Sequence, residues 1–214
     1  MPWVVSQKLP EDPEEFSNQF IVGCERADIS CEELPVLRAM KLEPRLIKSV
    51  QRVFSVPDAM LNPWKLLELL VEDIRYRGGE ILTQHQVTGF QIRNDRVTGV
   101  FLQGNGGRLL LEADVVVNAT GPWAMRVSEL AGQQVDMELT KGAIMVFAHR
   151  MVNKVINRCR PARSHDILAP SGTVCLFGTT SKVVDSPESN DVYQEETDML
   201  LAGATALVPD ISSC

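Results

Sequence analysis

Three arginines stand close together in a chain that is otherwise acidic. Arg158, Arg160 and Arg163 lie within six positions, whereas the 214 residues carry a formal net charge of -7. A guanidinium group donates two parallel hydrogen bonds from one plane, which suits the oxygens of a phosphate. The tract therefore indicates a site for an anionic ligand, and the alternative is a solvated loop with ordinary surface charge.

A second candidate site is the run of small residues at 118–121, which follows the uninterrupted apolar segment 115–117. Because Gly121 has no Cβ, the backbone there can come close to a bulky ligand. An apolar run without alternation is typical of a strand buried on both faces of a parallel sheet. Ligands of such sheets lie at the carboxyl ends of the strands. The alternative is an ordinary buried strand followed by a glycine turn.

Other polar residues indicate less specific chemistry. His149 could orient a ligand hydroxyl, with a structural histidine as the alternative. Thr179 and Thr180 end an expected strand, where they could face a ligand or cap a turn. The sequence shows neither paired carboxylates, nor a Ser/His/Asp arrangement, nor a metal site. Any chemistry near these residues would therefore depend on a cofactor, for which the chain supplies shape, orientation and charge.

The elements that must position these residues follow from periodicity and turn signals. Asn62 and Pro63 predict a helix start, and the apolar residues between 66 and 74 recur at helical spacing until glycines end the helix at 78–79. Short strands are expected at 80–83, 87–92, 96–103 and 108–112, the last three forming an antiparallel meander. The buried strand at 115–121 then leads into a helix that begins at Pro122.

The later part of the chain predicts a second sheet. Strands are expected at 142–148, 166–169 and 173–179, and a helix at 193–206. The fold class is therefore α/β plus α+β, with a meander and a parallel strand joined to a mixed or antiparallel sheet. We expect three segments, at 1–60, 61–135 and 136–214.

Composition excludes some classes of protein. The acidic balance argues against a nucleic-acid-binding surface, and no run approaches the ~20 apolar residues needed to cross a bilayer. Five cysteines without C-x-x-C spacing favour a reduced, cytoplasmic setting. Neither end of the sequence carries a closing element, so we expect a piece of a longer protein.

The order of helix, Gly-Gly break, meander and the strand ending in Ala119-Thr120-Gly121 resembles the later half of the FAD-binding domain in the D-amino-acid oxidase superfamily. The resemblance assigns 61–135 to that Rossmann-like domain, with FAD as the cofactor. It implies that Val87 contacts the adenine side through its backbone. It places Ala119, Thr120 and Gly121 near the pyrophosphate and ribose, with Trp123 as the aromatic residue just beyond them.

The second half resembles a narrower family within that superfamily, the A-type subunit of anaerobic glycerol-3-phosphate dehydrogenase. The resemblance rests on Lys141-Gly142-Ala143-Ile144, on His149-Arg150, and on the series 155–160, 166–170 and 178–181. It assigns 1–60 and 136–214 to a substrate domain, and it implies substrate contacts by Lys141, His149, Arg158, Arg160, Thr179 and Thr180. Aerobic relatives carry histidine where Ile144 stands, so the catalytic base is not identified.

The activity implied by the resemblance is oxidation of sn-glycerol 3-phosphate to dihydroxyacetone phosphate, with electrons passed through partner subunits to a quinone. Electron-transfer and membrane-anchor subunits would place the whole enzyme at the inner membrane as a peripheral cytoplasmic protein. The sequence has no G-x-G-x-x-G, so the FAD site is incomplete in this chain. The alternatives are an amine or amino-acid oxidase of the same superfamily and a non-catalytic binding module. Unpaired sheet edges also make a homo-oligomer of this piece possible.

Overall fold

The computed structural model describes residues 4–161, 165–209 and 211 of the chain. It divides into two units. The first comprises Met1–Leu61, Thr140–Lys182 and Asn190–Cys214, and the second comprises Asn62–Leu139 and Val183–Ser189. Arg163, the last arginine of the basic tract, lies outside the described residues.

The described part of the first unit is built on a seven-stranded sheet with the order β2-β3-β1-β9-β10-β11-β8. The strands β1 and β9 run parallel, and every other neighbouring pair in this sheet is antiparallel. Its strands and helices are β1 (Val4–Lys8), α1 (Glu14–Arg26), β2 (Glu32–Leu34), α2 (Val36–Leu42), β3 (Arg52–Val56), β8 (Ile144–Phe147), β9 (Val155–Arg158), β10 (Ile167–Ser171), β11 (Val174–Gly178) and α5 (Gln194–Leu207).

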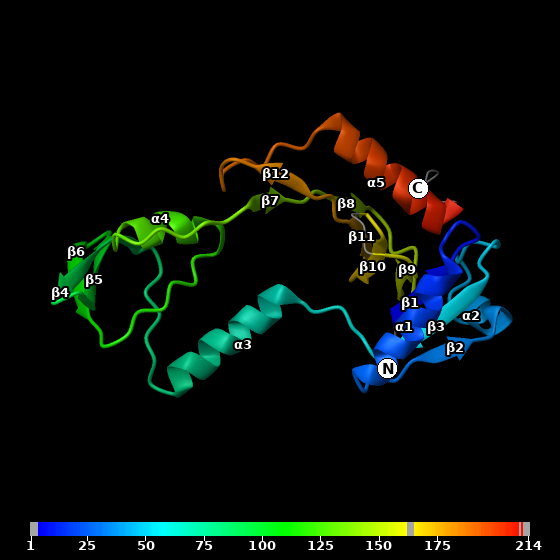
Figure 1. The fold of residues 1–214 in the computed structure, drawn as a ribbon, viewed down its shortest axis with the longest axis horizontal. Coiled ribbons are helices and arrows are strands. Elements are labelled where there is room, and N and C mark those ends of the chain that lie inside the picture. Colours follow the sequence, from blue (N-terminus) through cyan, green and yellow to red (C-terminus); the bar gives the residue numbers. More distant parts are fainter. Residues whose placement is uncertain (1–3, 162–164, 210, 212–214) are drawn as a thin grey trace. The chain divides into compact units, whose positions relative to one another are not determined.

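One face of this sheet packs on α5, which contacts β8 and β11 (Figure 1). Leu200 and Leu207 of the helix are fully buried in one cluster with Ile156, Leu168 and Phe177 of the strands. Burial of such large side chains stabilises the fold by about 1.5–3 kcal/mol each. The core of the first unit therefore lies between the sheet and this helix.

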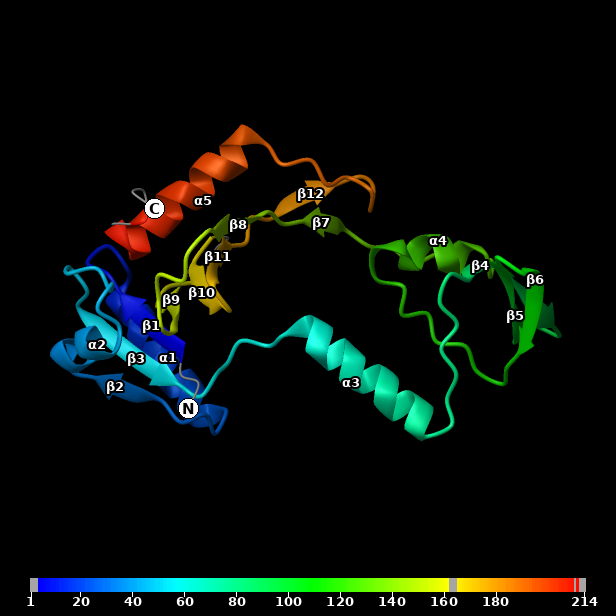
Figure 2. The same cartoon turned by 180° about the vertical axis from the view of Figure 1, so that it is seen from behind.

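The opposite face is only partly covered. At the β1 and β3 side, α1 lies against the sheet (Figure 2), where the rings of Phe20 and Phe54 are 5.8 Å apart. At the β8 and β10 side, the apolar side chains of Ile144, Val146 and Ile167 are exposed. The first unit therefore presents a bare apolar patch, made of these three residues, at one end of its sheet.

The second unit contains the antiparallel meander of β4 (Gln86–Arg93), β5 (Arg96–Gly104) and β6 (Gly107–Glu112). It also contains α3 (Pro63–Tyr76), the short 3-10 turn η1 (Gly121–Trp123) and α4 (Ala124–Glu129). Asn62 caps α3, accepting a hydrogen bond from the Lys65 backbone N–H at 3.1 Å. Where the chain passes between the units, β7 (Leu139–Lys141) pairs with β12 (Lys182–Val184).

Most expected elements are present, and the fold class predicted from the sequence is confirmed. The prediction of a buried strand at 115–121 is wrong. Residues 113–120 form no strand, and Val115 and Val117 are 78% and 80% exposed. The described residues contain no strand that pairs with this segment, and a strand needs a hydrogen-bonded neighbour. The strand expected at 80–83 is likewise absent, and β9 is an element that the sequence pattern does not predict.

The helix α3 is amphipathic but buries none of its residues. Its exposed apolar side chains are Trp64, Leu66, Leu67, Leu69, Leu70 and Ile74. A stripe of this kind normally faces a core or a partner. No helix in the described part of the chain combines the length and the apolar composition that a membrane span requires.

We predict that the 214-residue chain self-associates through the α3 stripe. Sedimentation velocity should show a sedimentation coefficient that increases with concentration. Replacing both Leu67 and Leu70 by Glu should shift the equilibrium toward monomer, because the new charges resist burial. The control is Glu72→Gln on the same helix. A chain that is monomeric at every concentration would contradict the prediction.

Candidate cofactor and substrate sites

A cavity of about 730 Å³ lies in the second unit, between the start of β4 and the segment that contains η1 and α4. Three residues that the resemblance assigned to the cofactor, Val87, Thr120 and Trp123, line it together. The full lining consists of His85, Gln86, Val87, Thr88, Thr120, Trp123, Arg126, Val127, Leu130 and Glu188. Val87 is thus brought to one concave site with residues that follow it by 33 and 36 positions.

The turn at 118–121 is held by the side chain of Asn118. Its Oδ1 accepts a hydrogen bond from Thr120 Oγ1 at 2.7 Å, and its Nδ2 donates to the Ala124 carbonyl at 2.9 Å. Ala119 and Gly121 flank Thr120 and are exposed. Gly121 has a φ of 58°, and a Cβ there would meet no atom within 4 Å. The backbone at this turn is therefore open to a ligand, as expected from the absence of a Cβ at Gly121.

One wall of the cavity is a network around Glu188. The Trp123 Nε1–H donates to Glu188 Oε1 at 3.0 Å, and Arg126 donates to both carboxylate oxygens at 2.6 and 2.7 Å. Ser186 Oγ also donates to Glu188. The hydrogen bonds from Arg126, Ser186 and Trp123 hold the pKa of Glu188 well below its usual range. The carboxylate is thus ionised at neutral pH.

In the first unit, Lys141 and Thr180 meet at a buried carboxylate. Lys141 Nζ lies 2.5 Å from Glu196 Oε2, and Thr180 Oγ1 donates to Glu196 Oε1 at 2.7 Å. Lys141 and Thr180 lower the pKa of Glu196 from 4.5 to about 2, because they stabilise its charged form. The ammonium group of Lys141 also lies 5.0 Å from the ring centroid of Tyr193. These contacts join β7, the end of β11 and α5 at one corner of the unit.

The same corner requires glycine at position 142. A Cβ on Gly142 would lie 2.7 Å from the carbonyl oxygen of Thr180, closer than side chains are found to backbone. The neighbouring Ala143 N–H donates to Thr180 Oγ1 at 2.8 Å, and the Thr180 N–H donates to the Ala143 carbonyl at 3.1 Å. The lysine-glycine pair of the sequence therefore has a packing role here.

The described arginines of the basic tract are held in ion pairs. Arg158, only 8% exposed, pairs with Asp12 and lies 2.9 Å from Glu11, while Arg160 pairs with Asp166. The alternative of a solvated loop is wrong for Arg158, since it ends β9 inside the unit. A phosphate contact by Lys141, Arg158 or Arg160 stays a prediction, and each of these cations already faces a carboxylate.

The remaining two candidates are open to solvent. His149 is exposed in the bend after β8, and Thr179 is exposed at the end of β11. Thr179 follows Gly178, which is paired in register with Ile144 of the bare patch. The structure therefore brings Thr179 to the edge of this patch, next to Thr180, which is buried.

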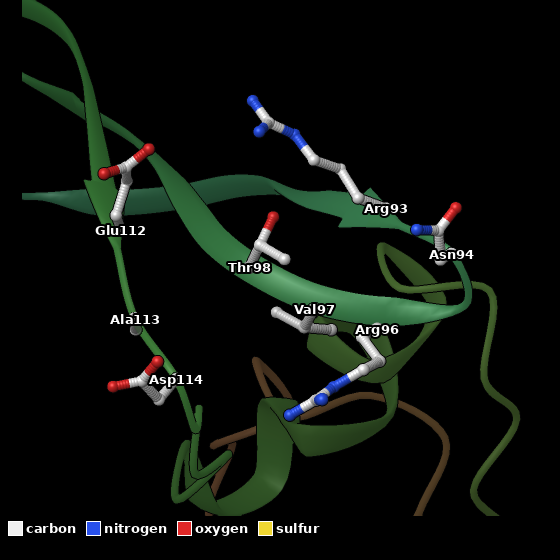
Figure 3. A pocket seen from close by; sticks show the side chains of 8 residues that line it. All are labelled: Arg93, Asn94, Arg96, Val97, Thr98, Glu112, Ala113 and Asp114. Atoms are coloured by element: carbon white, nitrogen blue, oxygen red, sulfur yellow. The ribbon is translucent and has the colours of Figure 1, made fainter.

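A second concave region, of about 570 Å³, lies at the β4–β5 turn (Figure 3). Arg93 and Arg96 flank that turn, with Glu112 and Asp114 across from them. The two guanidinium groups extend in different directions (Figure 3), so they do not converge on one anion. This region therefore lacks the convergent polar groups of a binding site.

Several residues of these sites were not found from the sequence. Glu188 and Arg126 complete the cavity wall, Asp12 neutralises the buried Arg158, and Glu196 pairs with Lys141. Only Glu196 carried a signal, since it stands at the third position of α5, where an acidic side chain can bind a backbone N–H. The Tyr193 N–H does donate to Glu196 at 3.2 Å. The other three depend on contacts between distant segments.

Comparison with known families identifies the class of protein. The family model described as FAD dependent oxidoreductase matches residues 8–214, so the chain belongs to that family. This confirms the resemblance inferred from the sequence. Among curated proteins, it is 38% identical over 205 residues to the A-type subunit of the anaerobic glycerol-3-phosphate dehydrogenase of Escherichia coli K12. It is 33% identical over 211 residues to the corresponding A1-type subunit of Haloferax volcanii.

Each alignment covers 94% of this chain but only 38% and 36% of those two relatives, respectively. Among solved structures, L-proline dehydrogenase from P. horikoshii matches 99% of this chain and 57% of its own, with a TM-score of 0.83 at 17% identity. The glycerol-3-phosphate dehydrogenase from Bacillus halodurans complexed with FAD matches 98% of this chain and 40% of its own, with a TM-score of 0.73 at 20% identity. These likenesses support the fold.

We predict that Gly142→Ala destabilises the chain by about 1–3 kcal/mol, because the new methyl group must displace the Thr180 backbone. Thermal unfolding would measure the loss. The matched control is Gly23→Ala in α1, where a Cβ meets nothing within 4 Å. That change should stabilise by about 0.5–1 kcal/mol. Equal melting temperatures for Gly142→Ala and wild type would show that the close approach is absent.

A second prediction concerns pH. Because the folded-state pKa of Glu196 lies below its ordinary value of 4.5, the ionised carboxylate stabilises the fold above pH 4.5, and this stabilisation is lost as pH falls toward 2. Glu196→Gln should lower the melting temperature at pH 7 by calorimetry, and the difference from wild type should shrink below pH 4.5. Glu195→Gln, at an exposed position of α5, is the control. A difference that is independent of pH contradicts the prediction.

Proposed function

We propose that this chain is part of an FAD-dependent dehydrogenase that oxidises sn-glycerol 3-phosphate to dihydroxyacetone phosphate. The observation that carries the proposal is the cavity in the second unit, which gathers Val87, Thr120 and Trp123. Family membership over residues 8–214 supports the cofactor, and the curated relatives, whose names are those of anaerobic glycerol-3-phosphate dehydrogenase, support the substrate.

The second unit, which includes most of 61–135, would hold the nucleotide end of FAD. The cavity combines an aromatic ring at Trp123, a hydroxyl at Thr120 and backbone groups at Val87, which fits an adenosine. Ala119 and Gly121 leave the adjoining backbone open for the pyrophosphate. The 214 residues contain no G-x-G-x-x-G, so they do not provide the usual phosphate loop. The site in this chain is therefore incomplete.

The first unit, which includes 1–60 and most of 136–214, would cover the substrate. Its bare patch of Ile144, Val146 and Ile167 can exclude water from a reacting centre. Thr179 and His149 are the exposed polar candidates for the substrate hydroxyl. Lys141, Arg158 and Arg160 are the candidate phosphate contacts, and each would have to exchange its carboxylate partner for the phosphate. Bound FAD would accept the hydride from the substrate carbon, while these residues bind and orient the substrate.

The whole enzyme would pass its electrons to a quinone through electron-transfer and membrane-anchor subunits. It would then lie in the cytoplasm as a peripheral protein of the inner membrane. The curated relatives are themselves named as one lettered subunit of their enzyme, which supports an assembly with further subunits.

The alternative of an amine or amino-acid oxidase has weaker support. Glycine oxidase from Bacillus cereus shares the fold with a TM-score of 0.78, but at 19% identity, and such a likeness concerns the fold alone. The curated relatives from Escherichia coli and Haloferax volcanii, both named as glycerol-3-phosphate dehydrogenase, match at 38% and 33% identity over 94% of the chain. A non-catalytic binding module is the remaining alternative, which the absence of a glycine loop keeps open.

The test uses a hybrid protein in which residues 1–214 replace the matched segment of the Escherichia coli relative. We predict that the hybrid retains FAD through gel filtration and that glycerol 3-phosphate, but not glycine or L-proline, bleaches the flavin absorbance. The 214-residue chain alone should hold FAD poorly, because it lacks the glycine loop. A folded hybrid without flavin would overturn the proposal, and bleaching by an amino acid would favour the oxidase alternative.

A further inference from the structure

Glu188 reaches the candidate cofactor cavity from a part of the chain far from its partners. It lies 65 residues after Trp123 and 62 residues after Arg126, in the segment Val183–Ser189 that returns to the second unit. All three residues line the cavity. The segment 183–189 therefore completes the cavity wall to which Trp123 and Arg126 contribute.

The geometry of this wall fixes two side chains at once. Both carboxylate oxygens of Glu188 accept from the guanidinium group of Arg126, and one of them also accepts from the Trp123 indole. A two-point pair of this kind orients a guanidinium group more strictly than a single contact does. The indole, which is partly exposed, has no freedom to rotate without losing its hydrogen bond.

The pair also sets the charge of the wall. Without Glu188, Arg126 would present a free cation to the cavity and favour a phosphate there. With Glu188, the positive charge is neutralised, and the wall presents an indole and a hydrogen-bonded pair. Such a wall suits an uncharged, planar heteroaromatic group better than an anion.

We propose that Glu188 is a positioning residue that holds Trp123 and neutralises Arg126, so that the cavity accepts the uncharged base of the dinucleotide and not its phosphates. This inference rests on the proposed function. Glu188 acts through Trp123 and Arg126 and needs no contact with the ligand of its own.

The experiment compares Glu188→Gln and Glu188→Asp with the control Glu80→Gln in the hybrid protein. Glu80 is an exposed carboxylate of the second unit that does not line the cavity, so the control makes the same charge change outside the Glu188 network. The first readout is the NMR cross-peak of the Trp123 indole Nε1–H, assigned with Trp123→Phe. The second is the dissociation constant for FAD, measured by flavin fluorescence on the stripped protein.

In Glu188→Gln, the Trp123 cross-peak should move, and FAD affinity should fall roughly threefold to tenfold, since the network is partly exposed. Glu188→Asp, which keeps the charge, should recover part of the affinity, and Glu80→Gln should change neither readout. The inference is overturned if the Trp123 cross-peak of Glu188→Gln keeps its wild-type chemical shift. It is also overturned if the cross-peak shifts while the dissociation constant for FAD is unchanged. In both cases the proposed function still stands. A wild-type hybrid that binds no FAD overturns both.

Discussion

The side chain of Asn118 fixes the turn on which the candidate cofactor site depends. Its carboxamide oxygen accepts a hydrogen bond from the Thr120 hydroxyl, and its NH2 group donates to the Ala124 carbonyl and the Ser128 hydroxyl. One amide thereby ties the open backbone at 119–121 to the start of α4. Because α4 carries Arg126 and follows Trp123, the orientation of the cavity wall depends on the same bonds.

Two carboxylates from the later part of the chain complete sites that earlier residues begin. Glu188 joins Trp123 and Arg126 in the second unit, and Glu196 joins Lys141 and Thr180 in the first. In each case an anion is placed between a cation and a neutral donor, which lowers its pKa. Each unit thus uses a carboxylate to orient residues and to cancel charge.

The elements that could be predicted from the sequence are those set by local signals, such as turn residues and helix caps. Turn residues and alternation identify the meander, and Asn62 with Pro63 identifies the start of α3. The apolar run at 115–117 is misleading because its pattern describes a strand only when neighbouring strands are present. Val115 and Val117 remain exposed where the described chain offers no such neighbour.

The candidate site could also be predicted only where local residue types determine it. Gly121 and Thr120 are recognisable from their types, and their turn is open as expected. Arg158 has the right chemistry for a phosphate, but no local pattern reveals that Asp12, 146 residues earlier, already accepts its hydrogen bonds. Residues whose role is set by distant charges are found only when the fold brings those charges together.

The central claim is that the cavity beside the Asn118 turn receives the adenine of FAD. Photolabelling of the hybrid protein with an FAD analogue carrying an azido group on the adenine, followed by mass spectrometry of peptides, tests it directly. The account predicts labelled peptides that contain residues 85–88 or 120–130. Labelling confined to other peptides, with these two unmodified, would contradict it.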